Sequence, residues 1–208
     1  MLLYCIRHGE SCYNAQGRIQ GQSDVPLSEL GLRQSEAVAA ALAGEGVEAL
    51  YASPLRRAMQ TAGPVADALQ VEIRTDPRLM EVHAGVFQDK LRTDLEQLYP
   101  EEIARWQSGD PDFVIPGGES RRQLMHRGHE VFDEIRRTGH EQVVVVTHGG
   151  LLSAALKSLL EIPAEKHPFV FQNGSITRLE WTDGEVKLHA LNQIDHLHQV
   201  GFSGRGDL

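Results

Sequence analysis

The sequence has little cysteine: only Cys5 and Cys12 occur among its 208 residues. Two cysteines cannot build the disulfide framework typical of small secreted domains, so their scarcity favours a reducing compartment. The N-terminal residues lack the basic lead and the small-residue cleavage site of a signal peptide, and they have the apolar pattern of a first strand. We therefore expect the protein to be cytoplasmic.

Long apolar runs and an excess of positive charge are also missing. No run reaches the roughly 20 apolar residues that a bilayer-spanning helix needs. Because 20 Lys and Arg residues face 29 Asp and Glu residues, the formal net charge is −9. Nucleic acids and membrane surfaces attract a broad basic face, so we expect neither as a partner. A site that handles phosphate must then gather its arginines locally. The sequence has neither a P-loop nor the Gly-x-Gly-x-x-Gly pattern of dinucleotide-binding folds.

The apolar segments predict an α/β protein. A chain of 208 residues can bury one core well, so we expect a single domain over residues 1–208, with a flexible tail from about residue 201. Four strands are predicted, and a hairpin around Asp183-Gly184 adds two more. These strands are Leu2–Ile6, Val47–Ala52, Val71–Arg74, Gln142–Thr147, Ile176–Trp181 and Glu185–Leu191.

Helices are expected between the strands. Ser28 is a good N-cap for a helix to about Ala43, and Ser53-Pro54 has the pattern of a cap followed by proline at the first helical position. The remaining helices are predicted from Ser53 to about Leu69, over a broken stretch Thr93–Gln107, from the Ser120 cap to Gly139, and over Leu151–Leu160. This alternation is typical of a three-layer α/β/α sandwich with a mainly parallel central sheet.

Unusual side chains follow three of these strands. Ligands of such sheets bind beyond the carboxyl ends of the strands, so these segments should meet in one crevice. They are Arg7-His8-Gly9-Glu10, Ser53-Pro54-Leu55-Arg56-Arg57 and Thr147-His148-Gly149-Gly150.

Histidines and arginines at one crevice suit phosphoryl transfer. A neutral imidazole is a good nucleophile, and neighbouring arginines disfavour its protonation. Each guanidinium about 4 Å from a phosphate charge contributes on the order of 4 kcal/mol at a surface-like dielectric. Arg7 and Arg56 can bind two phosphate oxygens bidentately, and the helix that starts near Gly149 adds a positive dipole end. We expect Arg57 to face solvent.

Four blocks together resemble the histidine phosphatase (phosphoglycerate mutase-like) superfamily, and the resemblance extends over roughly Leu2 to Trp181. It implies a phosphoglycerate mutase-like fold and a metal-independent mechanism without a cofactor. The blocks are Arg7-His8-Gly9-Glu10, Ser53-Pro54-Leu55-Arg56-Arg57-Ala58, Gly117-Gly118-Glu119-Ser120 and Thr147-His148-Gly149-Gly150.

The resemblance also implies roles for individual residues. His8 matches the phosphorylated nucleophile, and Glu81 matches the general acid that protonates the leaving oxygen. A dianionic phosphate should raise the pKa of a carboxyl group beside it, so such a carboxyl group suits the role of general acid. The rest of the phosphate pocket is matched by Arg7, Arg56 and His148. Substrate-binding residues are expected at Ser11, Asn14, Gln20, Gly21 and Gly149, although Asn14 and Gln20 also suit turn or capping roles.

The superfamily contains phosphatases and mutases, and two departures favour a phosphatase. The cofactor-dependent mutases have Glu-Arg-His-Tyr-Gly at the acid, where this chain has Val82 and Ala84. Segment 82–118 also looks too short for the insertion that those mutases carry. The phosphatase pattern Gly-x-Trp-Glu-Gly is itself imperfect here, since Gln88 and Asp89 depart from it. This departure puts the identity of the substrate in doubt more than the reaction.

Other motifs have simpler explanations. His189, His196 and His198 lack a carboxylate or cysteine at ligand spacing, so no metal site is expected. The glycosylation sequon at Asn173 and the Arg-Gly-Asp triplet at 205–207 are interpreted as accidental. Five basic residues could bind an anionic substrate tail, but a surface role is expected for each: Arg18, Lys90, Arg92, Arg121 and Arg122.

The sequence thus predicts a histidine acid-type phosphatase that hydrolyses a small phosphomonoester through a phosphohistidine. One alternative is a phosphoglycerate mutase that requires 2,3-bisphosphoglycerate. Another is a non-catalytic member of the superfamily that binds phosphorylated partners. The sequence names neither the substrate nor the oligomeric state.

Overall fold

A mixed sheet of six strands forms the centre of the molecule, in the order β3-β2-β4-β1-β5-β6. The computed structural model describes residues 1–182 and 184–202. Strands β3, β2, β4 and β1 run parallel to one another. Strand β5 is antiparallel to β1, and β6 is antiparallel to β5. The strands are β1 (Leu2–Arg7), β2 (Ala49–Ala52), β3 (Ile73–Thr75), β4 (Gln142–Thr147), β5 (Ile176–Thr182) and β6 (Glu185–Gln193).

Strand β4 explains why the sheet needs cover on both sides. Its four valines, residues 143–146, have no exposed surface. Successive side chains of a strand point to opposite faces, so Val143 and Val145 join one core cluster while Val144 and Val146 join the other. An unbroken apolar run therefore lies at the middle of the sheet, between β2 and β1.

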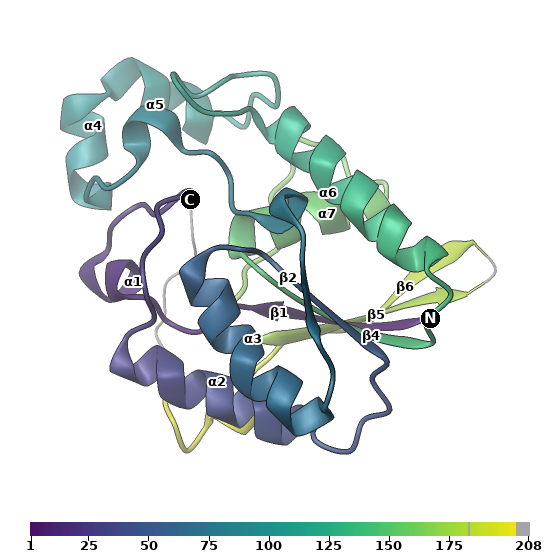
Figure 1. The fold of residues 1–208 in the computed structure, drawn as a ribbon. Helices are drawn as coiled ribbons and strands as arrows, with labels where there is room; N and C mark the ends of the chain where they lie inside the picture. The colour runs from purple at the N-terminus through teal and green to yellow at the C-terminus, as the bar shows by residue number, and fades with distance from the viewer. Residues whose placement is uncertain (183, 203–208) are drawn as a thin grey trace.

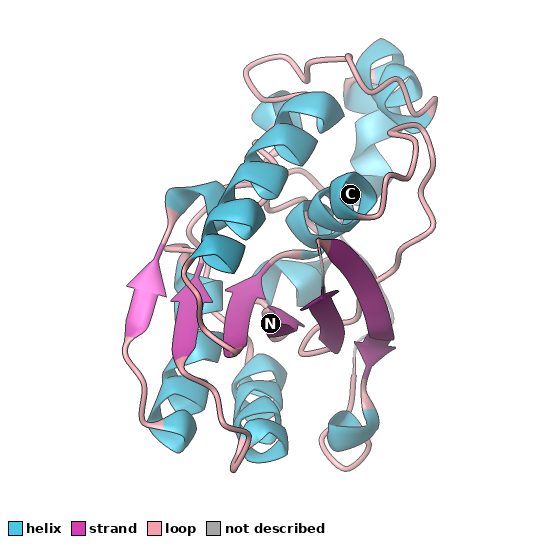
Figure 2. Cartoon of the chain, turned by 90° about the vertical axis from the view of Figure 1, so that its right-hand side faces the viewer, coloured by secondary structure: helices cyan, strands magenta, loops and turns pink. Residues whose placement is uncertain are grey.

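Helices cover both faces of the sheet (Figures 1 and 2). The pair α2 (Glu29–Leu42) and α3 (Arg56–Leu69) packs on one face, and the pair α6 (Arg121–Arg137) and α7 (Gly149–Leu159) packs on the other. The predicted α/β sandwich with a mainly parallel sheet is confirmed. Because β1, β4 and β2 are parallel, their carboxyl ends lie at one edge of the molecule, on the left in Figure 1.

The remaining helices lie beyond that edge. Helices α4 (Leu95–Leu98) and α5 (Pro100–Gln107) are at the upper left of Figure 1, above the short α1 (Cys12–Gln16). Ile103 and Trp106 anchor α5 in the core on the α6–α7 side. Four single-turn 3-10 helices complete the described residues, at Pro77–Leu79, Gly85–Phe87, Arg92–Asp94 and Asp195–Leu197.

Several predicted boundaries are confirmed. Ser28 caps α2 by accepting the Gly31 N–H at 3.1 Å, and Ser120 forms a capping box with Gln123 at the start of α6. The hairpin of β5 and β6 and the break before Pro100 are also present. No helix among the described residues is long and apolar enough to span a membrane.

Two predicted boundaries are wrong. Helix α1 lies inside the stretch predicted as a loop. Helix α3 begins at Arg56 with Leu55 as its N-cap, because the chain is still extended at Leu55 and the predicted cap, Ser53, hydrogen-bonds His148. The predicted tail from Gly201 falls mostly outside the described residues, as do Asp183 of the hairpin turn and the triplet at 205–207.

Candidate active site

The ends of β1 and β4 place two histidines side by side. Arg7 pairs with Thr147 in the parallel register, and the His8 N–H donates to the Thr147 carbonyl at 2.9 Å. The next residue of each strand is therefore a histidine at the same level of the sheet. The ring centroids of His8 and His148 lie 5.0 Å apart, and both side chains are fully buried.

The hydrogen bonds of His8 define its tautomer. Its Nδ1 lies 2.6 Å from the Gly9 carbonyl oxygen, and the Arg57 Nε–H donates to its Nε2 at 3.2 Å. A carbonyl can only accept and a guanidinium can only donate, so Nδ1 carries the proton and Nε2 presents a lone pair. Nε2 is thus the nucleophilic atom of a neutral ring.

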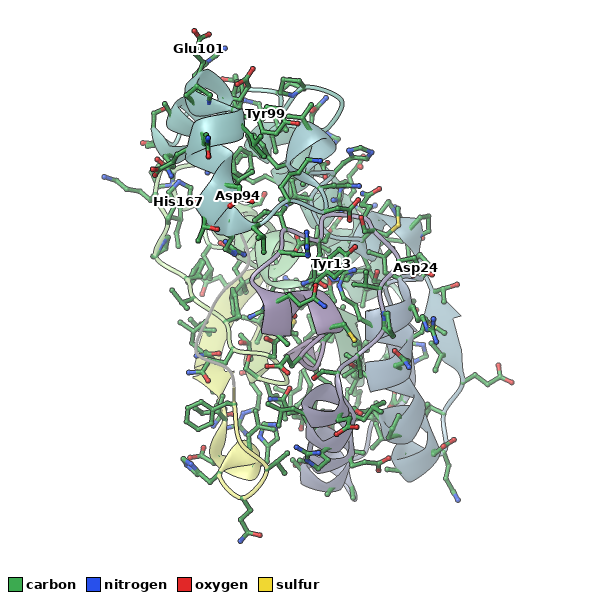
Figure 3. All side chains as sticks on the ribbon, turned by 90° about the vertical axis from the view of Figure 1, so that its left-hand side faces the viewer. Tyr13, Asp24, Asp94, Tyr99, Glu101 and His167 are labelled. Carbon is green, nitrogen blue, oxygen red and sulfur yellow. The ribbon has the colours of Figure 1, made fainter. Side chains whose placement is uncertain are left out.

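Arg57, not Arg56, is the arginine that β2 and α3 bring to His8. Arg57 is fully buried, and its two other nitrogens donate to the carbonyls of Ser23 and Gly21 at 2.9 and 2.8 Å. Arg56 is exposed, and its backbone N–H donates to Asp24, which Figure 3 labels. The predictions that Arg56 lines the pocket and that Arg57 faces solvent are both wrong.

The register of α3 explains the error. Within α3, Arg57 shares a helix face with Thr61 and Val65, because these lie four and eight residues further on, and both are buried. Arg56 lies about 100° around the helix from that face. The spacing of Arg57, Thr61 and Val65 was visible in the sequence and would have selected the right arginine.

His148 accompanies His8 as a neutral ring. Burial, reinforced by the nearby positive charge of Arg57, holds the pKa of His148 well below its usual value. Its Nε2 hydrogen-bonds the Ser53 hydroxyl at 2.8 Å, while its Nδ1 has no hydrogen-bond partner among the described residues. Arg7, also fully buried, donates through Nη1 to the Phe171 carbonyl at 2.6 Å. The structure therefore brings Arg57 and His148 against His8, the predicted nucleophile, and Arg7 precedes His8 at the end of β1.

Glu81 reaches the same place from the segment between β3 and α4. Its carboxylate accepts the backbone N–H groups of Gly150 and Leu151, in the first turn of α7, at 3.0 and 3.1 Å. A Cβ atom at residue 150 would lie 2.4 Å from Glu81 Oε1, so only glycine leaves room for this contact. The helix that follows His148 thus holds the predicted acid at its N-terminus.

Arg127 and Glu119 hold the backbone around Glu81, and we did not predict the role of Arg127. Arg127 forms a two-point ion pair with Glu119 and also donates to the carbonyls of Arg78, Met80 and Glu81. Glu119 in turn accepts the His83 N–H at 2.7 Å. The Gly-Gly-Glu-Ser block therefore positions the acid rather than the substrate. A single arginine within a helix gave no sequence signal for this role.

Asn173, whose sequon we interpreted as accidental, has a structural role that the sequence did not indicate. It is fully buried, and its Nδ2 donates to the His8 carbonyl at 3.1 Å and to the Asn14 side chain at 3.1 Å. The sequon at this position is thus part of the support of the nucleophile loop. Gly9 helps to fix the same loop, since its N–H donates to Thr61 Oγ1 at 3.0 Å.

The predicted substrate-binding residues divide into two groups. Gln20, Gly21 and Gly149 line the cavity beside Glu81. Ser11 and Asn14 form the capping box of α1, and the Ser11 hydroxyl donates to Gln20 Oε1 at 2.6 Å. Capping is therefore the role of Ser11 and Asn14 in this structure, and through Gln20 they set the position of a residue that lines the cavity.

A cavity of about 390 Å³ opens from Glu81 along α7. Its near end is formed by Gln20, Gly21, Glu81 and Gly149, and its walls include Trp106, Leu124, Phe169 and Phe171. Its volume suits a small metabolite. Among the described residues, no group of three or more His, Cys, Asp or Glu side chains could hold a metal ion. His189 contacts Glu180 and His196 contacts the Gly174 carbonyl.

Comparison with known proteins agrees with this geometry. Residues 3–194 match the model of the histidine phosphatase superfamily (branch 1), and the chain belongs to that family. A curated relative from Yersinia pestis, named probable phosphoglycerate mutase GpmB, is 36% identical over 187 residues, which cover 87% of this chain and 85% of the relative.

Solved structures with a similar fold include phosphatases. A mycobacterial glucosyl-3-phosphoglycerate phosphatase complexed with VO3 has a TM-score of 0.84 and 33% identity, over 92% of this chain and 98% of its own. A putative alpha-ribazole-5'-P phosphatase from Escherichia coli has a TM-score of 0.85 and 28% identity, over 93% of this chain and 96% of its own. The family and fold are thus shown, and the family contains both phosphatases and phosphoglycerate mutase-like proteins.

Proposed function

We propose that the protein is a metal-independent phosphomonoesterase that transfers phosphate from a small phosphorylated metabolite to His8 and then to water. The observation that carries this proposal is the lone pair of His8 Nε2, surrounded by Arg7, Arg57 and His148 at the end of β1. A neutral nucleophile among buried cations is suited to attack on a phosphate dianion.

In the first step, His8 Nε2 attacks phosphorus and the bond to the ester oxygen breaks. The substrate phosphoryl group takes the place of the Arg57 Nε contact, so that Arg57 turns from the nucleophile to a phosphate oxygen. The hydrogen bond from Nδ1 to the Gly9 carbonyl keeps the ring in its reactive tautomer as positive charge develops on it. Arg7, Arg57 and His148 stabilise the charge on the transferring group.

Glu81 supplies the proton that the leaving oxygen needs. A bound dianion disfavours a second negative charge beside it, so substrate binding favours the protonated form of Glu81. In the second step Glu81 takes a proton from water, the water oxygen attacks phosphorus, and the bond to Nε2 breaks. Phosphate leaves, and His8 and Glu81 return to their starting states. Because the acid must begin protonated, we propose a mildly acidic optimum, as in acid-type phosphatases.

A phosphoglycerate mutase is the second candidate, favoured by the name of the curated relative. Val82 and Ala84, where the mutase pattern has arginine and tyrosine, are 2% and 0% exposed and pack in the apolar core. They offer neither a cation nor a hydroxyl group to a phosphoglycerate carboxylate, and this supports the phosphatase. We also propose a cytoplasmic location and neither nucleic-acid nor membrane partners, in line with two free cysteines and a net charge of −9.

The experiment that tests the proposal measures phosphate release from a panel of phosphomonoesters in excess chelator, with wild type and His8→Ala. Release that survives chelation and is lost in His8→Ala supports a metal-free histidine phosphatase. Release that chelation abolishes contradicts it. If no ester is hydrolysed, but 2- and 3-phosphoglycerate are equilibrated only when 2,3-bisphosphoglycerate is added, the protein is the mutase.

A further inference from the structure

Besides Arg92, three basic side chains that no motif contains line the cavity, and they lie towards the end away from Glu81. They are Arg121 at the start of α6, Lys157 on the last turn of α7, and His167 on the segment after α7. Figure 3 labels His167 with Asp94 and Tyr99 in the upper part of the face where the parallel strands end. The proposed reaction uses none of the three, so their presence in the same cavity needs another explanation.

The predicted surface role of Arg121 is wrong, because Arg121 lines the cavity and is held there without a carboxylate partner among the described residues. Its guanidinium stacks on the Trp106 ring at 3.6 Å from the centroid, and its buried Nη1 has no hydrogen-bond partner among residues 1–182 and 184–202. The nearest acid, Asp110, pairs with Arg105 at 2.9 Å. The neighbouring Arg122 shows the ordinary alternative, since it is exposed and pairs with Asp112 through two nitrogens. Burial lowers the pKa of Arg121 to about 10.

Lys157 is the second buried cation. It is 3% exposed, and its ammonium group donates to the neutral Ala164 carbonyl at 2.9 Å. Lysine is almost never buried to this extent without a paired charge. Burial, followed by repulsion from Arg121, lowers the pKa of Lys157 to about 8, while Glu165 acts in the opposite direction. Lys157 and Arg121 thus repel each other at the end of the same cavity.

Two desolvated cations that repel each other are stabilised by an anion between them. In the proposed reaction the ester oxygen lies beside Glu81, at the other end of the cavity, so an anion at this end must come from another part of the substrate. The walls between the two ends are mainly apolar: Trp106, Leu124, Phe169 and Phe171. These side chains suit a spacer of low polarity better than a chain of charged groups.

Helix α7 gives the distance between the two ends. Gly150, Ala154 and Lys157 all line the cavity, at spacings of four and three residues, so one face of the helix runs along its whole length. Seven residues of α-helix rise about 10 Å. Gly150 holds the Glu81 carboxylate, and Lys157 stands at the other end.

We propose that Arg121 and Lys157 bind a second anionic group of the substrate, a carboxylate or a second phosphate, at the end of the cavity that lies about 10 Å along α7 from Gly150 and its contact with Glu81. This inference rests on the proposed phosphatase function and narrows its substrate class to phosphomonoesters with an anionic tail. His167 closes the rim of this anionic-tail site. Its pKa is lowered by burial and by Arg121 and Lys157, so it is a neutral hydrogen-bond donor at neutral pH.

The test uses pairs of substrates that differ only in tail charge. A series of ω-carboxyalkyl phosphates of increasing chain length is compared with the matching ω-carboxamides, and the readout is the ratio of kcat/KM within each pair. At the length that spans the cavity, wild type should favour the carboxylate roughly 10- to 100-fold, as expected for one or two charge-assisted hydrogen bonds. The α,ω-bisphosphate of that length then ranks phosphate against carboxylate, and either ranking above the amide supports the site.

Variants test whether Arg121 and Lys157 cause the preference for the carboxylate. Lys157→Met and Arg121→Gln should each bring the ratio down towards one, whereas the matched controls Lys166→Met and Arg122→Gln should keep it, because both residues are exposed. A ratio compares two substrates of one enzyme preparation, so a partly unfolded variant does not distort it. The proposal is overturned if wild type hydrolyses both members of every pair equally, or if neither variant changes the ratio. Absence of hydrolysis of all the esters would contradict the phosphatase function itself.

Discussion

Two regions of the molecule hold their cations in different ways: the buried site around His8, called the His8 end, and the part of the cavity lined by Arg121 and Lys157, called the Lys157 end. At the His8 end, each of the three guanidinium nitrogens of Arg57 donates to an acceptor: His8 Nε2 and the carbonyls of Ser23 and Gly21. At the Lys157 end, Arg121 stacks on a ring with one nitrogen unsatisfied among the described residues, and Lys157 has only a backbone carbonyl.

This difference suggests that the His8 end carries out the chemical step and that the Lys157 end recognises the substrate. Backbone and side-chain acceptors preorganise the His8 end, which suits a chemical step common to every phosphomonoester. At the Lys157 end neither cation forms an ion pair within the part of the chain that the structure describes, which suits a group that arrives with the substrate. The family motifs all lie at the His8 end or support it. Membership of the family therefore concerns the His8 end, whereas the residues of the Lys157 end belong to none of these motifs.

The largest effect should come from the acid at the His8 end. Glu81→Gln should lower kcat for alkyl phosphates by roughly 10²- to 10⁴-fold, because an alkoxide leaves poorly without a proton. Nitrophenyl phosphate, whose leaving group needs little protonation, should lose about tenfold at most. Steady-state kinetics on both esters decide the matter, and equal losses would remove Glu81 from this role.

A smaller effect should distinguish the two adjacent arginines of α3. Arg57→Lys keeps the charge but cannot reach His8, Ser23 and Gly21 together, so kcat/KM should fall roughly 100-fold. Arg56→Lys, the matched exposed control, should stay within about threefold of wild type. Thermal melts of both variants check that the fold is intact. A larger loss in Arg56→Lys than in Arg57→Lys would restore the original prediction from the sequence.

Gly150 tests how the acid is held. The Cβ of Gly150→Ala would displace the Glu81 carboxylate, which should lower activity on alkyl phosphates about 10- to 100-fold. Gly63→Ala, in the middle of α3, is the control, because its Cβ would meet nothing within 4 Å. If the two variants were equally active, the contact between α7 and Glu81 would have no part in positioning the acid.

The smallest effect concerns pH at the Lys157 end. Lysine carries its charge only below its pKa, so the carboxylate-over-amide ratio should fall several-fold as pH rises through about 8, the pKa of Lys157 in the free protein. Arg121 keeps its charge over this range and His167 is already neutral, so neither adds a second transition. In Lys157→Met the ratio should not change with pH. A flat profile in wild type would mean that Lys157 does not contact the tail.

The sequence predicted what depends on local pattern. The valines of β4, the Ser28 and Ser120 caps and the β5–β6 hairpin follow from periodicity and capping, and the strand-end rule brought His8 and His148 together. Glu81 needed the family resemblance, since nothing local distinguishes it from other carboxylates.

What the sequence did not predict depends on tertiary packing. The choice between Arg56 and Arg57 is the exception, because the spacing of Arg57, Thr61 and Val65 marks the buried face of α3 and was visible in the sequence. Arg127, Asn173 and Lys157 each take their role from a segment far away in the chain: the loop of Glu81, the loop of His8 and the start of α6. No single-residue signal marks such contacts in advance.

The central claim is that His8 carries the phosphoryl group. The most direct measurement mixes wild-type protein with a hydrolysed ester in excess chelator, stops the reaction within one turnover in alkali, which preserves phosphohistidine, and maps the modified peptide by mass spectrometry. The account predicts phosphate on His8, formed before product and absent from His8→Ala. Phosphate release without any phosphorylated His8 within the first turnover would contradict it.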